Sequence, residues 1–393
     1  MKKVWYVLSM VLVGLVSACQ SDTPSMIELG LDDTYVVARM KSLTLHPEFT
    51  GERYEWRLSY ESAAGAVSDS LVATTRDYTF VAGEEGTYRL KLNIFDPANP
   101  IEHLMQIVVR REEVAYSPYI TRVYEYRPAP GQFINVLPQY EEGDTEETMR
   151  QKVEECLAYN AGSIISLGGY GGYVVVGFDH TIVNRPGEYD FKVLGNATQG
   201  GSEPGIVMVS VDVNGNGMPD DEWYELAGSE YHKASTVKGY EITYYRPDEN
   251  KTPVPGSSTS ITDATYQYWT DNQGGNGYIS RVAFHKQPYY PQWLPYESLT
   301  FEGTRLADNA VDESGNGSYY VLNAYDWGYA DNYPNNNEKI NFKIDWAVDG
   351  EGNPVSLSGI DFVKIYTGVN QCNGWIGECS TEVAGVTDLH IAG

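Results

Sequence analysis

The chain has 393 residues and a formal net charge of −27, with 54 acidic residues against 27 basic ones. This length favours two or three domains. The acidic excess argues against nucleic acid and anionic membrane surfaces as partners, because a phosphate backbone needs a basic face. The 32 tyrosines and 39 glycines are typical of β-rich proteins with broad recognition surfaces.

The N-terminus has the features of an export signal. Lys2 and Lys3 precede an apolar run over residues 4–16, which is too short to span a bilayer. The run ends in Ser17-Ala18-Cys19, which resembles a bacterial lipobox. We therefore expect a signal peptide over 1–18, lipidation of Cys19, a tether over 19–26 and a surface-exposed position on the outer membrane. The alternative is a secretory signal without a lipid.

Residues 27–111 consist of short strand candidates separated by turns, at 34–37, 43–45, 54–58, 71–75, 78–81, 87–95 and 105–109. The segments 54–58, with Trp56, and 86–96, with Gly86-Thr87-Tyr88, resemble the polycystic-kidney-disease-type immunoglobulin-like domain. That resemblance implies that Trp56 fills a sandwich core and that the domain is a spacer. Residues 112–118 form the predicted linker.

Residues 119–393 form the second predicted domain. Residues 144–147 resemble a helix-capping box, and Met149, Val153, Cys156 and Leu157 then share one face, which predicts an amphipathic helix to residue 160. Short strands and polar turns make up the remainder and look like the jelly-roll sandwiches of secreted bacterial proteins. The expected fold is all-β: an immunoglobulin-like sandwich, then a larger jelly-roll-like β-sandwich with one helix.

Two glycine-rich stretches of this domain have specific predictions. Residues 163–178 predict a hairpin rather than a phosphate loop, because no helix and no Lys follows the glycines. Residues 212–222 alternate oxygen-bearing side chains with glycine, which suits a calcium ion. The predicted ligands are Asp212, Asn214, Asn216, Met218 (through its carbonyl), Asp220, Asp221 and Glu222. Glu203 is a further candidate for the same ion. The alternative is an Asn-Gly turn between two strands.

Aromatic side chains gather beside Asn, Asp and Gln in three segments, 262–277, 288–296 and 324–337. Such segments are typical of surfaces that bind sugars or flat rings. The predicted ligand-binding residues are Tyr266, Tyr268, Trp269, Tyr290, Trp293, Tyr325, Trp327, Tyr329 and Tyr333. The alternative is that these rings pack beneath the loops.

Cysteine and histidine provide few further candidates. Cys372 and Cys379 are predicted to form a disulfide outside the cytoplasm. Asp179-His180 is a candidate acid–base or metal-binding pair, although no nucleophile motif accompanies it. The chain lacks the common hydrolase and zinc motifs, so we expect a non-enzymatic protein.

Four long segments, 167–180, 203–228, 342–355 and 359–389, look like a group of uncharacterised Bacteroidetes surface lipoproteins. Proteins similar to this group accompany outer-membrane cobalamin-uptake systems. The resemblance therefore implies capture of a corrinoid such as cobalamin beside an outer-membrane transporter. The alternatives are a glycan-binding lipoprotein of a polysaccharide-uptake system, a glycan-active enzyme with a carboxylate pair, and an adhesive structural protein.

Overall fold

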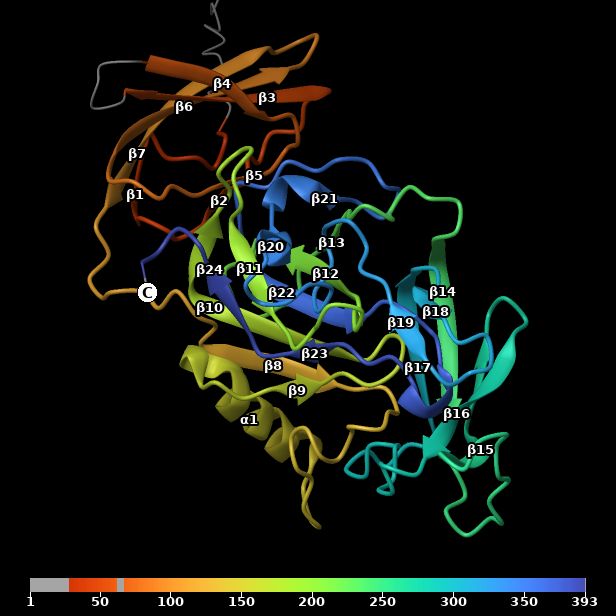
Figure 1. Ribbon diagram of the computed structural model, residues 1–393. Helices are drawn as coiled ribbons and strands as arrows, with labels where there is room; N and C mark the ends of the chain where they lie inside the picture. Colours follow the sequence, from red (N-terminus) through yellow and green to blue (C-terminus); the bar gives the residue numbers. More distant parts are fainter. Residues whose placement is uncertain (1–27, 62–66, 393) are drawn as a thin grey trace, which may run out of the picture.

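The computed structural model describes residues 28–61 and 67–392. The predicted signal peptide, Cys19 and the tether lie outside these residues. The described chain is an all-β protein with a single α-helix, as predicted. An N-terminal sandwich lies at one end, packed sheets form the middle, and a four-stranded lobe lies at the other end (Figure 1).

The N-terminal sandwich has one large and one small sheet. The five-stranded sheet has the order β1-β7-β6-β3-β4 and consists of β1 (Thr34–Ala38), β3 (Arg53–Glu61), β4 (Val67–Ala73), β6 (Gly86–Phe95) and β7 (Ile101–Arg110). The second sheet pairs β2 (Leu43–Leu45) with β5 (Tyr78–Phe80). Because β1 runs parallel to β7 and the other pairs are antiparallel, the arrangement is that of an immunoglobulin-like sandwich.

Trp56 lies at the centre of this sandwich, as expected from the sequence. Its side chain is fully buried, and its indole Nε1 donates a hydrogen bond to the carbonyl of Thr75 at 3.0 Å. Alternate residues of β6, including Leu90 and Leu92, point into the same core. The alternating pattern of β6 therefore covers one face of the sheet and leaves the other to solvent.

The middle of the molecule is built on a six-stranded antiparallel sheet with the order β21-β13-β12-β22-β10-β8. Its strands are β8 (Arg122–Arg127), β10 (Tyr173–Val183), β12 (Gly205–Ser210), β13 (Trp223–Leu226), β21 (Ala347–Val348) and β22 (Gly359–Thr367). A three-stranded sheet of β20 (Asn341–Phe342), β11 (Phe191–Leu194) and β24 (Gly385–Asp388) shares its core.

Both faces of the central strand β12 are buried. Val207 and Val209 belong to the main core, whereas Ile206 belongs to a second cluster that includes Tyr366. The continuous apolar sequence of β12 reflects this two-sided burial.

The lobe is a four-stranded antiparallel sheet with the order β16-β15-β14-β17. Its strands are β14 (Val237–Tyr245), β15 (Ile261–Asp271), β16 (Asn276–Val282) and β17 (Ser298–Arg305). One face packs on the main core through Tyr240, Ile242 and Tyr244, and the other face lies outside. Two short pairs complete the strands: β18 (Ala310–Asp312) with β19 (Tyr320–Leu322), and β9 (Ile165–Ser166) with β23 (Glu382–Val383).

The predicted helix is α1 (Glu146–Leu157). Thr145 caps its N-terminus, and Met149, Val153 and Leu157 are buried against β8 and β9. Short 3-10 turns occur at Ala158–Asn160, Glu338–Ile340, Ile344–Trp346 and Gly374–Ile376. No helix in the described part of the chain is long and apolar enough to cross a membrane.

The structure corrects two local predictions. The glycine-rich segment is not a hairpin, because β9 pairs with β23, whereas β10 pairs with β8 and β22. Residues 262–277 are not an aromatic loop but most of β15, a turn and the start of β16. Tyr and Trp at alternate positions favour a pleated strand, and the loop prediction underestimated that preference.

Candidate ligand-binding face

Four of the nine predicted ligand-binding rings belong to the interior. Tyr266, Tyr290, Trp293 and Tyr329 are all buried. The phenol oxygen of Tyr290 donates to the carbonyl of Tyr296 at 2.9 Å, and that of Tyr329 accepts from the backbone N–H of Glu230 at 3.0 Å. A buried ring offers no surface to a ligand, so we reassign these four residues to core packing.

Three other predicted rings, in segment 324–337, are half-buried and engaged with their own neighbours. The rings of Trp327 and Trp346 lie 4.6 Å apart, and Tyr325 donates its hydroxyl to the carbonyl of Ala307. Tyr333 lies beside Lys339, whose ammonium donates to its hydroxyl at 3.3 Å. No described contact brings these rings to Tyr268 or Trp269, so the predicted three-segment surface is not assembled.

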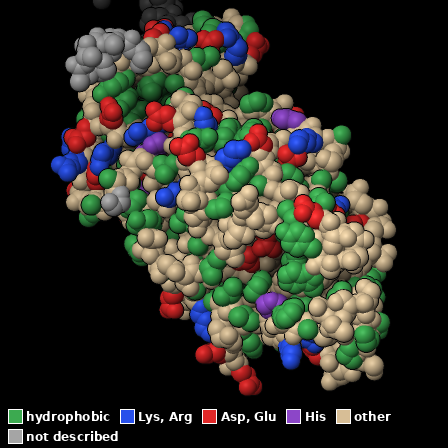
Figure 2. Space-filling view, viewed as in Figure 1, with side chains coloured by type: hydrophobic (Ala, Val, Ile, Leu, Met, Phe, Trp, Pro, Cys, Tyr) green, Lys and Arg blue, Asp and Glu red, His purple; other side chains and the backbone are tan. Residues whose placement is uncertain are grey.

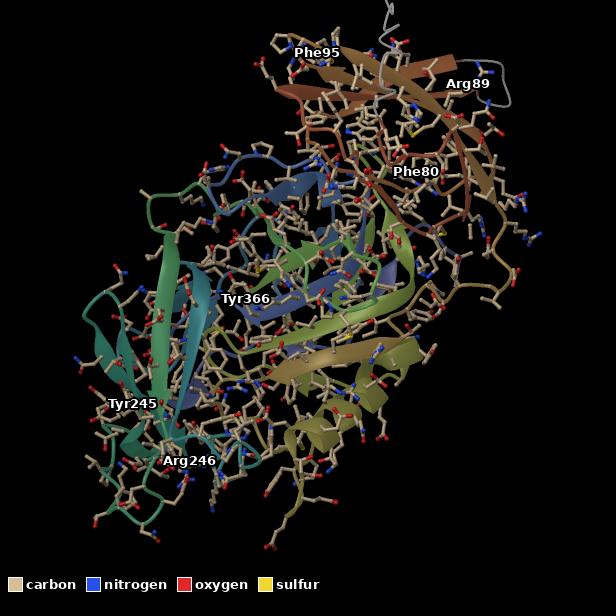
Figure 3. All side chains as sticks on the ribbon, turned by 180° about the vertical axis from the view of Figure 1, so that it is seen from behind. Phe80, Arg89, Phe95, Tyr245, Arg246 and Tyr366 are labelled. Carbon is tan, nitrogen blue, oxygen red and sulfur yellow. The ribbon has the colours of Figure 1, made fainter. Side chains whose placement is uncertain are left out.

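The outer face of the four-stranded lobe instead has a row of tyrosines on neighbouring strands. Tyr268 of β15 is paired directly with Tyr278 of β16, and their ring centroids lie 5.2 Å apart. On the other side, Tyr268 stacks on Tyr245 of β14 with centroids 5.5 Å apart. Tyr245 and Tyr278 are 41% and 43% exposed. Figure 3 shows Tyr245 on this lobe, away from Tyr366 in the interior.

A second row of polar side chains runs beside the tyrosines. Thr243 is paired with Thr300 of β17 on one side and with Thr270 of β15 on the other, and Thr270 is paired with Asn276. The hydroxyls of Thr243 and Thr300 lie 2.8 Å apart, and the Tyr245 hydroxyl lies 3.2 Å from that of Thr270. We call the three tyrosines together with these four polar residues the tyrosine face.

Tyr268 is among the residues predicted from the sequence, whereas Tyr245 and Tyr278 are not. The signal was present in residues 239–246, where strict alternation places Tyr245 on the opposite face from Tyr244. Because Tyr244 is buried, Tyr245 must point outward. Tyr278 requires the register between β15 and β16, which a single sequence does not provide.

A small cavity lies on the inner side of the same lobe. Its volume is about 60 Å³, and Trp269, Tyr170, Gln371 and Glu378 are among its lining residues. Glu378 is 1% exposed, and burial raises its pKa to about 8. Such a cavity has room for water but not for a sugar ring.

The predicted calcium loop extends from the end of β12 and is mostly exposed. Its oxygens accept hydrogen bonds from within the loop: both oxygens of Asp212 accept backbone N–H groups of Asn216 and Gly217, and Asp220 accepts the side-chain amides of Asn214 and Asn216. These amides lower the pKa of Asp220. Asp221 binds two N–H groups of residues 213 and 214, and Glu222 accepts the hydroxyl of Tyr224. All the candidate ligand atoms for the ion are oxygens, as a calcium site requires. The calcium site itself stays a prediction.

Glu203 does not extend this loop. It lies at the opposite end of β12, where its oxygen accepts the backbone N–H of Ser380 at 3.2 Å. Residues 312–318 form a loop like 212–218, with the backbone N–H of Gly317 donating to Asp312 at 2.7 Å. The described loop 312–318 therefore repeats hydrogen bonds of the predicted calcium loop.

The predicted disulfide is not formed. Cys372 and Cys379 both have free thiols. Cys379 packs in the second core cluster with Ile206 and Tyr366. Cys372 is exposed, and its backbone forms an isolated β-bridge with that of Glu378.

The Asp179–His180 pair is part of a buried network rather than an open site. The His180 ring lies between two carboxylates, with Nδ1 2.8 Å from Asp179 and Nε2 2.8 Å from Asp388. Tyr116 of the linker stacks on the ring with centroids 5.2 Å apart. Both ring nitrogens are occupied, so the network fastens the linker to the head.

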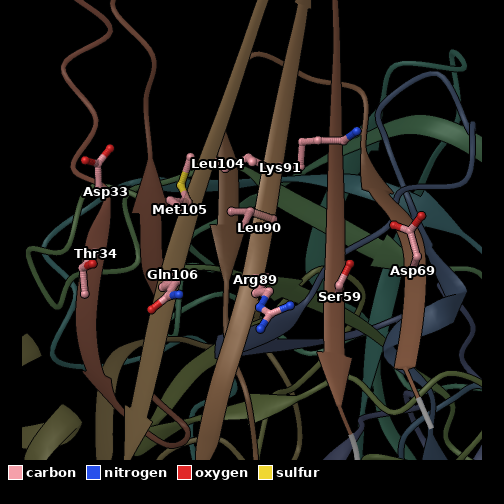
Figure 4. A pocket seen from close by; sticks show the side chains of 10 residues that line it. All are labelled: Asp33, Thr34, Ser59, Asp69, Arg89, Leu90, Lys91, Leu104, Met105 and Gln106. Atoms are coloured by element: carbon pink, nitrogen blue, oxygen red, sulfur yellow. The ribbon is translucent and has the colours of Figure 1, made fainter.

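A groove of about 720 Å³ lies on the outer face of the N-terminal sheet (Figure 4). Its walls combine Asp69 and Lys91 with Ser59, Leu104 and Gln106. Asp69 is already paired with Arg57 at 3.3 Å. The groove is the curved, solvent-facing side of the sheet and carries both acidic and basic side chains. Its described side chains do not converge on one point. Figure 2 shows the same mixture of acidic, basic and apolar side chains over the visible surface.

No family model matches the chain, and no curated protein matches it either. Among solved structures, the SusE-like protein BT2857 has 9% sequence identity to this chain and a TM-score of 0.26. The alignment covers 91% of this chain and 96% of the other. A TM-score this low supports neither a shared fold nor a shared activity, so the functional argument rests on the chain's own residues.

Proposed function

We propose that this protein is a non-enzymatic, lipid-anchored surface protein that binds a saccharide on the tyrosine face. The observation that carries the proposal is the row Tyr245–Tyr268–Tyr278 on neighbouring strands of one sheet, in which the two outer rings are exposed and the central ring of Tyr268 is half-buried. Saccharide binding was the alternative in the sequence analysis, where a corrinoid was the first expectation.

The tyrosine row supplies apolar contact area with little loss of side-chain freedom. A tyrosine has only two side-chain torsions, so ordering it costs less entropy than ordering a long flexible chain. Strands lie about 4.8 Å apart, so three neighbouring rings extend over about 10 Å. That length suits one or two sugar rings, whose C–H faces pack on aromatic surfaces.

The polar row supplies the hydrogen bonds that a saccharide needs. Thr243, Thr270 and Thr300 each have a hydroxyl that both donates and accepts, and Asn276 adds an amide. Sugar hydroxyls also donate and accept, so the two rows together match the apolar faces and polar rims of a sugar chain. None of these side chains is charged, which favours a neutral saccharide.

An alternative explanation is that the three tyrosines only stabilise the sheet, since cross-strand aromatic pairs contribute roughly 0.2–1 kcal/mol each. That role does not require the rings to stay exposed beside a row of hydroxyls. A corrinoid was expected on three aromatic segments, but four of their nine rings are buried. The saccharide proposal therefore has the better structural support.

The proposal also includes the untested sequence predictions. Lipidation of Cys19 would place the protein on the outer membrane, with the N-terminal sandwich as a spacer and an outer-membrane transporter as partner. Calcium bound by residues 212–222 would stiffen a loop beside the sandwich, because Asp221 and Glu222 line the same 380 Å³ cleft as Asp77 and Thr79.

Affinity gel electrophoresis tests the proposal. The soluble protein from residue 21 onward is run through gels containing neutral or acidic polysaccharides, with free cyanocobalamin titrated separately. We expect at least one neutral polysaccharide to retard the wild type and a Tyr245→Ala/Tyr268→Ala/Tyr278→Ala variant to run unretarded. Tyr319→Ala is the matched control, because Tyr319 is 56% exposed outside this face.

Two results would reject the proposal. One is retardation of the triple variant to the same extent as the wild type. The other is binding of cyanocobalamin with no polysaccharide in the panel bound, which would restore the corrinoid expectation. Release of reducing sugars during incubation would instead identify a glycan-active enzyme.

A further inference from the structure

Three carboxylates from distant parts of the chain meet in the interior of the head. They are Glu203 before β12, Asp331 in segment 324–337, and Glu382 in β23. One oxygen of each lies within 4.8 Å of one oxygen of both others. Asp331 and Glu382 are each 1% exposed.

The surrounding protein provides no positive charge to this cluster. Among the described residues, no Lys, Arg or His lies within salt-bridge distance of any of the three carboxylates. Burial is the main cause that raises the pKa of each of the three groups, and repulsion by Glu382 adds to it for Glu203 and Asp331. Three acids without a counter-charge are costly to bury, so the cluster requires a physical explanation.

Backbone groups nevertheless hold Asp331 in a fixed position. Its Oδ1 accepts the N–H groups of Asn196 and Ala197 at 2.8 and 2.7 Å, and its Oδ2 accepts the N–H of Glu382 at 3.0 Å. Asp331 also has a positive φ of 49°, which is uncommon for a residue other than glycine. Hydrogen bonds from N–H groups stabilise an ionised carboxylate. These bonds therefore fix the orientation of the Asp331 side chain and favour the ionised form, which is the form that binds cations.

Glu382 provides an independent observation that points to a bound positive group. Its Oε1 accepts the hydroxyl of Ser380 at 2.7 Å, but its Oε2 is buried and has no hydrogen-bonding partner among the described residues. The side chains of Ser166, Glu203 and Asn196 also approach this carboxylate and lower its pKa, although none of them forms a hydrogen bond with Oε2. A buried carboxylate oxygen without a partner, next to two other carboxylates, indicates a site for a positive group.

We propose that Glu203, Asp331 and Glu382 bind a divalent cation, with calcium as the preferred ion. All three ligands are hard oxygens, which disfavours zinc, copper and other ions that prefer nitrogen or sulfur. Calcium–oxygen distances are about 2.3–2.6 Å, so oxygens on opposite sides of one ion lie about 5 Å apart. The observed limit of 4.8 Å fits that geometry. The larger ion also tolerates the irregular arrangement better than magnesium does.

The bound ion would be structural. It would join the start of β12, segment 324–337 and β23, which are separated by up to 179 residues in sequence (203 to 382). This site is separate from the loop 212–222, which lies at the other end of β12. The inference is independent of saccharide binding on the tyrosine face.

The test compares variants of the two sites. Full-length wild type, Glu382→Gln, and Asp212→Asn as the loop control are stripped with chelator and dialysed against calcium. Bound calcium per chain is then measured by mass spectrometry, and melting temperatures are recorded with and without calcium. We expect Glu382→Gln to bind one ion fewer than the wild type, whereas Asp212→Asn keeps the ion bound by the three carboxylates.

The melting temperatures provide a second criterion. Saturating calcium should raise the wild-type value by about 5 °C or more, following the usual linkage between binding and stability. Glu382→Gln should lose this rise, yet should melt no lower than the wild type in chelator, because the amide removes one of three acidic groups that burial disfavours in their charged form. A rise retained in Glu382→Gln, or a calcium content equal to that of the wild type, would overturn the proposal.

One measurement needs no variant. Crystals of the wild type soaked in manganese should show an anomalous peak between Glu203, Asp331 and Glu382. Absence of a peak there after soaking at millimolar manganese in calcium-free solution would overturn the proposal, whether or not the loop 212–222 is occupied.

Discussion

Glu378 shows how burial alters one residue of this acidic chain. Its Oε1 accepts the backbone N–H of Gln132 at 2.6 Å, while its Oε2 is buried without a partner among the described residues. Since no described basic side chain pairs with it, the carboxyl group takes up a proton, and its pKa rises to about 8. The unfolded chain holds this group at its ordinary pKa of about 4.3.

We predict that Glu378→Gln stabilises the protein in a pH-dependent manner. Between about pH 4.5 and 8 the folded state binds a proton that the unfolded state releases, so the stability of the wild type falls as pH rises. Glutamine does not titrate, so the variant should match the wild type near pH 4.5 and exceed it by at least about 1 kcal/mol at pH 8. Urea unfolding in chelator at both pH values measures this. A variant that is less stable than the wild type at pH 8 would contradict the prediction.

Individual site residues were only partly predictable. Residue type and clustering made Tyr268 and the oxygen-rich loop candidates, but the sequence could not tell exposed Tyr245 from buried Tyr290. Both are tyrosines with aromatic neighbours in sequence, and only the path of the chain decides which ring meets solvent. The buried carboxylates are a similar case, because Glu203, Asp331 and Glu382 come together only after the sheets form.

The glycine-rich segment before β10 gives a prediction at the scale of an element. Gly168 has a φ of +71°, and a Cβ placed on it would lie 2.0 Å from the carbonyl oxygen of Ala129. Gly187 has a similar φ of +84°, but no atom lies within 4 Å of its Cβ position. An alanine at either position would therefore have the same backbone strain, but only at Gly187 is there space for its Cβ.

We expect Gly168→Ala to destabilise the protein by more than about 3 kcal/mol, because the backbone of two segments must separate. Gly187→Ala should cost only about 1–2 kcal/mol, from the left-handed backbone alone. Thermal and chemical unfolding of the two variants measures the difference. Equal destabilisation would show that steric contact at Gly168 does not matter.

Local patterns predicted the elements better than their pairing. The 3.6-residue periodicity and the capping residues gave α1 (Glu146–Leu157), and alternation gave the strands of the N-terminal sandwich within a few residues. β9 pairs with β23, and the paired residues Ser166 and Glu382 are 216 residues apart in the chain. No local sequence pattern indicates such a distant pairing. The hairpin expectation for residues 163–178 was wrong because glycine content indicates a turn without indicating the partner strand.

At the scale of the whole molecule, the sandwich and the head have separate hydrophobic cores. Trp56 belongs to a cluster that contains residues of the sandwich only. Across the junction, the ammonium of Lys41 donates to the carbonyl of Asp179 at 2.7 Å, and the N–H of Thr181 donates to the carbonyl of Met40 at 2.8 Å. Domains that have their own hydrophobic cores can in principle fold alone.

We predict that Trp56→Ala disturbs the sandwich without disturbing ligand binding. Removing a fully buried indole should destabilise the sandwich by about 3–5 kcal/mol. Calorimetric scanning should show an early transition for the sandwich, while the head melts near its wild-type temperature. Retardation in polysaccharide gels should remain as in the wild type. Loss of retardation in this variant would show that the sandwich takes part in binding.

The most direct test of the central claim is isothermal titration of the polysaccharide that retards the wild type, after partial hydrolysis to oligosaccharides. The account predicts saturable binding to one site per chain by the wild type and by Tyr319→Ala. It also predicts a loss of at least tenfold in affinity, about 1.4 kcal/mol, for Tyr268→Ala, whose ring lies between those of Tyr245 and Tyr278. Unchanged affinity in Tyr268→Ala, with a folded spectrum, would contradict it.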